Sequence, residues 1–126
     1  DCVKIGNKII CGSRGWCVEG SPDFKAQARP IYHREVERLR LAFSKVNQIR
    51  EDGDEVICAV HYPPFNARRD NSLFTDIFEQ NGVNKVIYGH LHGSESRADL
   101  KIVKNGIEYF LTSCDQVNNK LTLITE

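Results

Sequence analysis

The stretch Glu55-Val56-Ile57-Cys58-Ala59-Val60-His61 is an almost continuous apolar run that ends in a histidine. Such a run is typical of a strand that is covered on both faces of a sheet. A second strand is predicted at Lys85–Tyr88. An apolar pattern between the two predicts a helix at about Ser72–Gln80, with Asn71 or Ser72 as its N-cap. A strand, a helix and a strand in this order form a parallel unit whose strands end at the same edge. The sequence therefore predicts that His61 lies beside Gly89-His90.

Upstream of this stretch the pattern predicts a pair of strands and a long covering helix. Residues Val3–Cys11 form the strand pair around a turn at Gly6-Asn7, and a loop is predicted at Gly12–Trp16. Pro30 suits the first turn of a helix that we expect to run to about Arg50. The apolar residues of this helix recur at steps of three and four, which places them on one face: Val36, Leu39, Phe43 and Val46. The charged residues fall outside that face: Arg34, Glu35, Glu37, Arg38 and Arg40.

Beyond Gly93 the pattern changes to short antiparallel strands. The dipeptide Asn105-Gly106 between the apolar segments Ile102-Val103 and Ile107–Leu111 predicts a type I′ hairpin. Asn118-Asn119 predicts a second hairpin in the same way. The expected fold is therefore α/β, with a parallel βαβ unit followed by antiparallel hairpins.

Length and composition predict one domain over residues 1–126. Hydrophobic residues at 40% and charged residues at 27% are ordinary values for a globular protein and argue against disorder or a fibrous repeat. Basic and acidic residues number 17 each, so we expect no cationic face for generic nucleic-acid binding. No apolar run approaches the ~20 residues that a membrane-spanning helix needs, so we expect no membrane partner.

The cysteines and the chain start carry two further expectations. Five cysteines without a C-x-x-C pair argue against a disulfide framework and against a zinc ribbon, so we expect a cytoplasmic protein. The chain contains no methionine and begins at Asp1. We therefore expect that this chain is the C-terminal part of a longer protein.

Three of the four histidines follow the two predicted strands: His61, His90 and His92. Ligand sites of open α/β sheets lie beyond the carboxyl ends of the strands. In an extended segment, residues two positions apart project to the same side. His90 and His92 are therefore each expected to bind one of two metal ions that lie roughly 3.5–4 Å apart. Gly89 and Gly93 let the backbone bend close to such ions. With His61 at a neighbouring position, the three histidines predict a metal site.

Two segments resemble the last two metal motifs of the calcineurin-like metallophosphoesterases: Ala59-Val60-His61-Tyr62-Pro63-Pro64-Phe65-Asn66 and Val86-Ile87-Tyr88-Gly89-His90-Leu91-His92-Gly93. The second segment contains that family's G-H-x-H motif. Gly12–Trp16 and Ser113–Asp115 also resemble a bacterial branch of predicted phosphohydrolases, so the resemblance extends over nearly the whole chain. It implies that His61 and His90 are ligands of one metal ion and that His92 is a ligand of the other.

The resemblance further implies a fold, an activity and a cofactor. The chain would form the C-terminal half of the family's α/β/β/α sandwich, which is one sheet with its covering helices. The intact protein would hydrolyse phosphate esters with two divalent ions, Mn, Fe or Zn, which polarise the phosphoryl oxygens and activate a bound water. A phosphorylated substrate is the expected partner, and no substrate-binding residue is identified.

The family's remaining motifs are not recognised among these residues: D-x-H, G-D with its bridging aspartate, and G-N-H with its metal asparagine and catalytic histidine. No catalytic residue is therefore assigned within this chain. Two divalent ions held by three neutral imidazoles would lack the carboxylate that offsets their charge and fixes their separation. We expect the chain alone to hold one ion or none and to be a poor catalyst. Four acidic residues are possible surrogate ligands, and their spacing selects none of them: Asp70, Asp76, Glu95 and Asp99.

Other candidates have simpler interpretations. His33 lies among charged residues near the start of the predicted helix, and we expect it to face solvent. Arg68 and Arg69 are placed to meet a substrate phosphate, but adjacent arginines in a polar loop are more often solvated. Trp16 either lines a substrate cleft or covers the core, and the sequence does not choose between the two.

Two other functions remain open. The chain can be a non-catalytic folding or metal-binding unit. A histidine-triad nucleotide hydrolase would use a histidine nucleophile, but Ser94 stands where its third histidine is required and His61 has no role in it. Half of a sandwich would also expose an apolar face of its sheet, so we expect the chain to self-associate.

Overall fold

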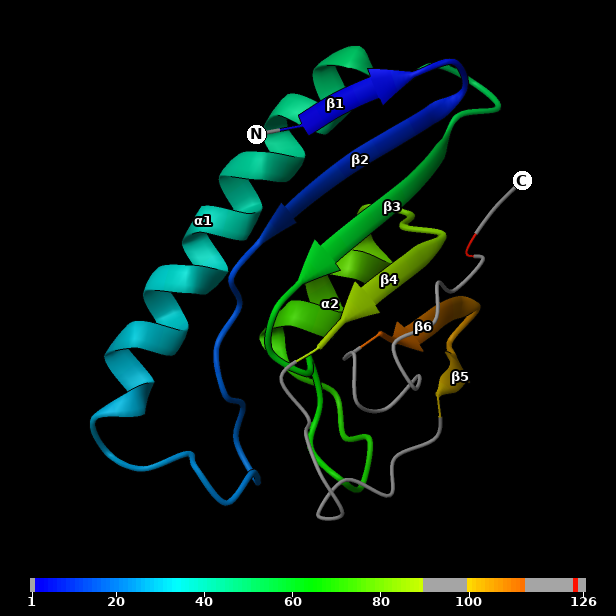
Figure 1. Cartoon of the computed structure of the whole chain (residues 1–126). Helices are drawn as coiled ribbons and strands as arrows, with labels where there is room; N and C mark the ends of the chain where they lie inside the picture. The colour runs from blue at the N-terminus through cyan, green and yellow to red at the C-terminus, as the bar shows by residue number, and fades with distance from the viewer. Residues whose placement is uncertain (1, 90–99, 113–123, 125–126) are drawn as a thin grey trace.

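The computed structural model describes residues 2–89, 100–112 and 124. Over these residues the fold is α/β, with two helices and a six-stranded mixed sheet (Figure 1). The elements follow in the order β1 (Cys2–Ile5), β2 (Lys8–Ser13), α1 (Ala28–Ile49), β3 (Glu55–Val60), α2 (Leu73–Gln80), β4 (Lys85–Tyr88), β5 (Lys101–Lys104) and β6 (Ile107–Leu111). None of the helices in this part of the chain is both long and apolar enough to cross a bilayer.

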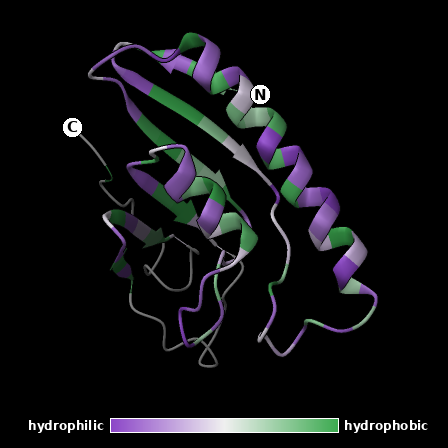
Figure 2. Cartoon of the chain, turned by 180° about the vertical axis from the view of Figure 1, so that it is seen from behind, coloured by the Kyte–Doolittle hydropathy of each residue, from purple (hydrophilic) through white to green (hydrophobic). Residues whose placement is uncertain are grey.

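The predicted parallel unit of β3, α2 and β4 is confirmed. The strand order in the sheet is β1-β2-β3-β4-β6-β5, and β3 pairs in parallel with both β2 and β4. The elements β2, α1 and β3 therefore form a second unit of the same kind. Right-handed crossovers that step in one direction along a sheet place their helices on the same face. Both helices cover one face of the sheet, and Figure 2 shows them in front of the strands.

The hairpin at Asn105-Gly106 is confirmed, but the antiparallel pattern predicted beyond Gly93 is only partly correct. Both turn residues have positive φ, 51° and 82°, as a type I′ turn requires. β5 and β6 pair antiparallel through this turn, whereas β6 pairs in parallel with β4. A hairpin signal fixes the direction of its two strands relative to each other but not their place in the sheet. The second predicted hairpin, Asn118-Asn119, lies outside the described residues.

The predicted loop at Gly12–Trp16 begins two residues too early. Gly12 and Ser13 belong to β2 and pair with Ala59 and Val60 of β3. A Cβ atom on Gly12 would lie 2.3 Å from the carbonyl oxygen of Ala59, so a glycine allows the two strands to approach at this point. The glycine therefore marks a close strand contact.

The two helices are tied to each other at both ends. Near the start of α1, the hydroxyl oxygen of Tyr32 accepts a hydrogen bond from the amide of Leu73 (2.8 Å). At the other end, the guanidinium of Arg50 donates to the carbonyl oxygen of Asn81 (2.8 Å). Of the two predicted N-cap candidates, Ser72 is the N-cap of α2, and its side chain accepts from the amide of Thr75 in a capping box. Both helices are fixed on the same face of the sheet. The loops that connect β2 to α1 and β3 to α2 are therefore held at both ends.

The core lies between the sheet and the two helices. Its largest fully buried side chains are aromatic or aliphatic and come from both layers: Tyr32, Leu39 and Phe43 from α1, Phe74, Ile77 and Phe78 from α2, and Ile9, Tyr88, Tyr109 and Leu111 from the sheet. Strand residues of the alternate positions face away from the helices. Four of these are exposed apolar side chains, with exposed fractions from 42% to 66%: Val3, Ile5, Ile10 and Val103.

Candidate functional site

His61 lies at the carboxyl end of β3, where its backbone is fixed by two neighbouring loops. Its amide donates to the carbonyl oxygen of Arg14 (3.1 Å), which also accepts from the amide of Tyr62 (3.2 Å). The imidazole packs edge-on against the ring of Tyr62, with 4.9 Å between ring centroids, and His61 is exposed. An exposed imidazole on a fixed backbone is suited to bind a metal ion or a substrate group.

The predicted proximity of the two strand ends is confirmed as far as Gly89. The amide of Gly89 donates to the carbonyl oxygen of His61 (3.0 Å), directly after the last strand pair, Val60 and Tyr88. His90 and His92, the other two predicted ligands, lie outside the described residues. The structure therefore brings His61 next to the residue that precedes His90, and the metal site of the three histidines stays a prediction.

The loop after His61 is anchored in the core and to the loop after β2. Phe65 is buried against the rings of Tyr88 and Tyr109, at centroid distances of 5.7 and 5.0 Å. The side-chain amide of Asn66 donates to the carbonyl oxygen of Glu19 (3.1 Å) and to a carboxylate oxygen of Asp70 (2.9 Å). These contacts hold the loop in place beside the strand ends.

Asp70, one of the possible surrogate ligands, and Asp54, which was not among them, both have other partners. Asp70 accepts from Asn66 and Arg68, and these hydrogen bonds hold the pKa of its carboxyl below the ordinary value. The dipeptide Gly53-Asp54 has the letters of a G-D motif, but it precedes β3, and Asp54 pairs with Lys4 (2.8 Å). It therefore lies at the opposite end of β3 from His61. Within residues 2–89, 100–112 and 124, no three His, Cys, Asp or Glu side chains gather at metal-binding distance.

Trp16 packs against the core and also lines a cavity. Its ring packs against Tyr62, with 5.1 Å between centroids, and it also contacts the core. Together with Tyr62 and Ile31 it lines a mostly apolar cavity of about 350 Å³. The guanidinium of Arg14 lies over the Trp16 ring, 4.6 Å from its centroid. The rings of Trp16 and Tyr62 therefore link the guanidinium of Arg14 to the imidazole of His61.

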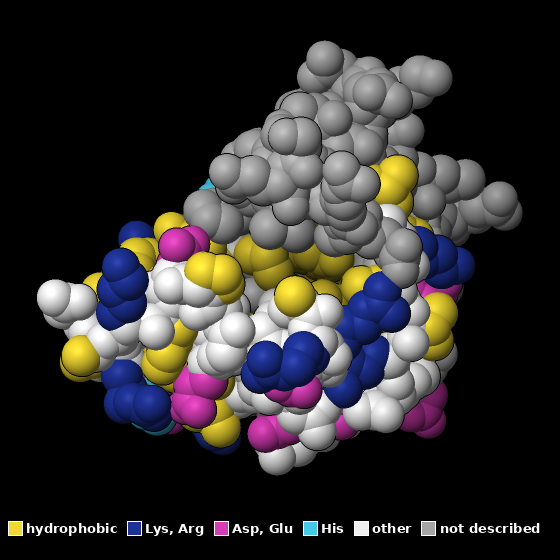
Figure 3. All heavy atoms as spheres, turned by 90° about the horizontal axis from the view of Figure 1, so that it is seen from below, with side chains coloured by type: hydrophobic (Ala, Val, Ile, Leu, Met, Phe, Trp, Pro, Cys, Tyr) yellow, Lys and Arg dark blue, Asp and Glu magenta, His cyan; other side chains and the backbone are white. Residues whose placement is uncertain are grey.

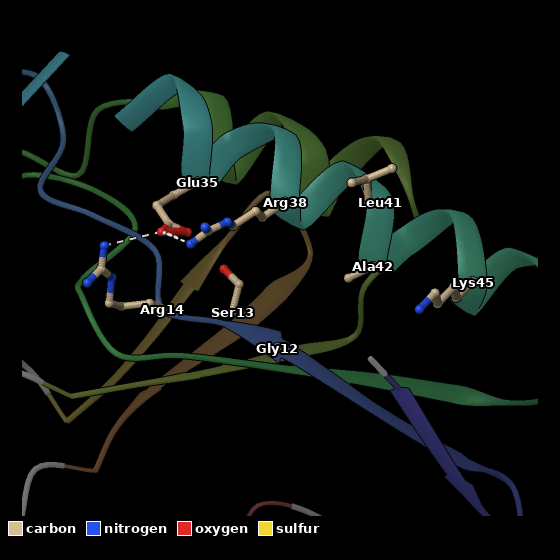
Figure 4. Close-up of a pocket in the computed structure, with 8 residues that line it drawn as sticks. All are labelled: Gly12, Ser13, Arg14, Glu35, Arg38, Leu41, Ala42 and Lys45. Atoms are coloured by element: carbon tan, nitrogen blue, oxygen red, sulfur yellow. Dashed lines mark hydrogen bonds and ion pairs between the residues drawn. The ribbon is translucent and has the colours of Figure 1, made fainter. Parts of the chain in front are cut away.

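A buried carboxylate on α1 was placed wrongly by the sequence pattern. Glu35, predicted outside the covered face of its helix, is 1% exposed. Its Oε1 atom accepts from Arg14 (3.2 Å) and from Arg38 (2.9 Å), as Figure 4 shows. Glu35 precedes Val36 on the helix and lies at the border of the apolar stripe, where an ion pair with a distant arginine allows burial. The position next to the stripe is the signal that could have identified it.

Arg68, Arg69 and His33 are exposed, as expected. Arg68 pairs with Asp70 (3.0 Å) and is 69% exposed, and Arg69 and His33 are exposed as well. Figure 3 looks at the molecule from below and shows Lys and Arg side chains gathered on this side, toward which β2, β3 and β4 point in Figure 1. The described cysteines are free thiols: Cys2, Cys11, Cys17 and Cys58.

Comparisons with known proteins identify no family for this chain. No family model, curated protein or solved structure matches it. Its function is therefore argued from the residues at the strand ends and from their geometry.

Proposed function

We propose that this chain is the C-terminal half of a metal-dependent phosphoesterase, in which His61, His90 and His92 are metal ligands. The observation that supports this most directly is the hydrogen bond from the Gly89 amide to the His61 carbonyl oxygen (3.0 Å). It brings the residue before His90 into contact with His61 at the carboxyl ends of the parallel strands β3 and β4, the kind of place where α/β proteins bind ligands.

The donor set fits a first-row divalent ion. His61 presents an exposed imidazole, and imidazole suits Zn, Fe and Mn. When bound, such ions polarise a phosphoryl oxygen and lower the pKa of a water that attacks phosphorus. The residues of this chain fix the direction of the imidazole: Arg14 holds the amide of His61, and Tyr62 packs against its ring.

The carboxylates that compensate two divalent ions are to be supplied by other residues of the intact protein. Asp54 is engaged with Lys4 at the far end of β3, and Asp70 is engaged with Asn66 and Arg68. Neutral imidazoles alone leave the charge of the ions uncompensated. We therefore propose that the chain alone binds one ion rather than two and turns over phosphoesters slowly.

Hydrolysis of a generic phosphodiester by the intact protein, measured with added Mn²⁺, tests the assignment. Replacing His61, His90 or His92 with alanine is expected to lower kcat by about 100-fold or more, as for loss of a group that acts directly in catalysis. His33→Ala is the matched control, since His33 is an exposed histidine on α1. Full phosphodiesterase activity in a variant with alanine at His61, His90 and His92 would contradict the assignment.

A further inference from the structure

A second polar site lies on the helix side of β2, in a cavity that the metal proposal does not use. The cavity is about 280 Å³ in volume and lies between α1 and the carboxyl half of β2 (Figure 4). Its polar and backbone lining comes from Gly12, Ser13, Arg14, Glu35, Arg38 and Lys45. The volume is at the lower limit of the roughly 300–1,000 Å³ that cavities for drug-sized ligands have, so it suits a small ligand.

The charge of this cavity is positive. Three cationic side chains, Arg14, Arg38 and Lys45, line it together with one carboxylate, that of Glu35. Glu35 is 1% exposed, and the side chains of Arg14 and Arg38 are 49% and 59% exposed. The carboxylate is therefore enclosed by protein, while both guanidinium groups remain open to solvent.

Glu35 also holds the two guanidinium groups in place. Both donate to its Oε1 atom, at 3.2 Å from Arg14 and 2.9 Å from Arg38. A guanidinium has five N–H groups, so each arginine keeps donors for a ligand while its position is fixed. Ser13 accepts from the amide of Gly15 (3.1 Å), which leaves its hydroxyl hydrogen to donate. Fixed donors reduce the entropy that is lost when a ligand binds.

We propose that this cavity binds a phosphate group or a similar tetrahedral oxyanion. Two positioned guanidinium groups match the paired oxygens of such an anion, and Lys45 adds a third positive charge. The proposal is independent of the metal site, although Arg14 belongs to both regions through its carbonyl oxygen, which accepts from the amide of His61 (3.1 Å).

Trp16 provides the readout. It is the single tryptophan of the chain, and the Arg14 guanidinium lies 4.6 Å from its ring centroid. An anion that binds the guanidinium of Arg14 changes its cation–π contact with Trp16 and hence the tryptophan fluorescence. Inorganic phosphate is titrated into the chain at constant ionic strength set with sodium chloride. A chelator is present throughout, so that no metal ion contributes to phosphate binding.

A saturable response to phosphate is expected, with at least tenfold weaker binding in Arg38→Gln and in Lys45→Gln. Lys45→Gln leaves both contacts of Glu35 intact, so it reports on binding even if Arg38→Gln is destabilised. Arg40→Gln is the matched control, because Arg40 is on the same helix and pairs with Glu37 outside the cavity (3.2 Å). Sulfate is expected to compete with phosphate, and acetate is not. No saturable response, or equal affinity in Lys45→Gln and Arg40→Gln, would overturn the proposal.

Discussion

The amide of Gly89 donates a hydrogen bond to the carbonyl oxygen of His61, with 3.0 Å between the two atoms. This contact continues the parallel pairing of β3 and β4 by one residue beyond Val60 and Tyr88. The two strands therefore end in step, and the residues that follow them start from adjacent positions at one edge of the sheet. The proposed metal site depends on this register, since a shift of one residue would turn His61 to the other face.

The register of β3 and β4 is supported at its other end by Asn84. Its Oδ1 atom accepts from the amide of Val56 (2.8 Å), a residue that is fully buried. Asn84→Ala leaves this amide without its acceptor and is expected to lower the free energy of unfolding by roughly 1–3 kcal/mol. Asn84→Asp keeps an acceptor oxygen and is expected to lose less than half as much. Urea unfolding of both variants checks this, and equal losses would contradict the assigned role.

The N-cap of α2 predicts a second stability effect. Ser72 accepts from the amide of Thr75 (3.1 Å) and donates to the carbonyl oxygen of Pro64 in the loop after His61 (2.5 Å). Ser72→Ala is expected to cost about 0.5–2 kcal/mol in the free energy of unfolding. The neighbouring Asn71→Ala is expected to change it by no more than about 0.5 kcal/mol, because Asn71 is exposed and its Oδ1 atom accepts from Lys104 at the surface. Thermal unfolding that ranks the two variants in the opposite order would count against this role of Ser72.

Asp54 predicts a pH dependence of stability. The ammonium of Lys4 (2.8 Å) and the backbone amide of Glu51 (2.9 Å) hold the pKa of Asp54 below its ordinary value of 3.8. The stability that the carboxylate contributes is therefore present above pH 3.8 and is lost as the pH falls through the lower pKa of the folded state. Asp54→Asn is expected to lower Tm at neutral pH, with a difference from the wild type that narrows below pH 3.8.

Glu51→Gln is the control for this titration. The Glu51 side chain is 80% exposed and lies farther from Lys4 (3.5 Å), so its removal is expected to leave Tm nearly unchanged. Thermal unfolding of the three proteins between pH 2 and pH 7 gives the comparison. A constant difference between Asp54→Asn and the wild type over this range would refute the prediction.

The sheet face opposite the helices predicts self-association. Val3 and Ile5 are 57% and 63% exposed on this face, and exposed apolar patches commonly mark contact surfaces. A double Val3→Thr, Ile5→Thr variant is expected to shift the concentration-dependent association toward the monomer in analytical ultracentrifugation. Leu41→Thr is the control, since Leu41 is 67% exposed on α1. A wild-type chain that stays monomeric at all concentrations would disprove the prediction.

Features that depend on adjacent residues were predicted from the sequence. The start of α2 at Asn71 or Ser72 and the turn at Asn105-Gly106 are local signals. The turn is confirmed, and of the two candidates Ser72 is the N-cap. The place of His61 beside Gly89 followed from the order of strand, helix and strand, because handedness and parallel pairing limit the arrangements of such a unit.

Features that depend on distant partners were missed. Glu35 is buried because Arg14, which lies 21 positions away in sequence, supplies an ion pair. Gly12 belongs to a strand because the backbone of Ala59 approaches it closely. The parallel pairing of β6 with β4 likewise depends on contacts that a hairpin signal does not contain. In the candidate site, the ligand roles of His61, His90 and His92 stay predictions.

Calorimetric titration of Zn²⁺ and Mn²⁺ into the chain tests whether His61, His90 and His92 bind a metal ion. The wild type is compared with His61→Ala, with the pair His90→Ala and His92→Ala, and with His33→Ala as a control for an exposed histidine of α1. One metal ion is expected to bind to the wild type. His61→Ala and the His90 and His92 pair are each expected to weaken its affinity at least tenfold, and His33→Ala is expected to have no effect. Unchanged metal affinity in His61→Ala, or no metal binding by the wild type, would contradict the proposed metal site.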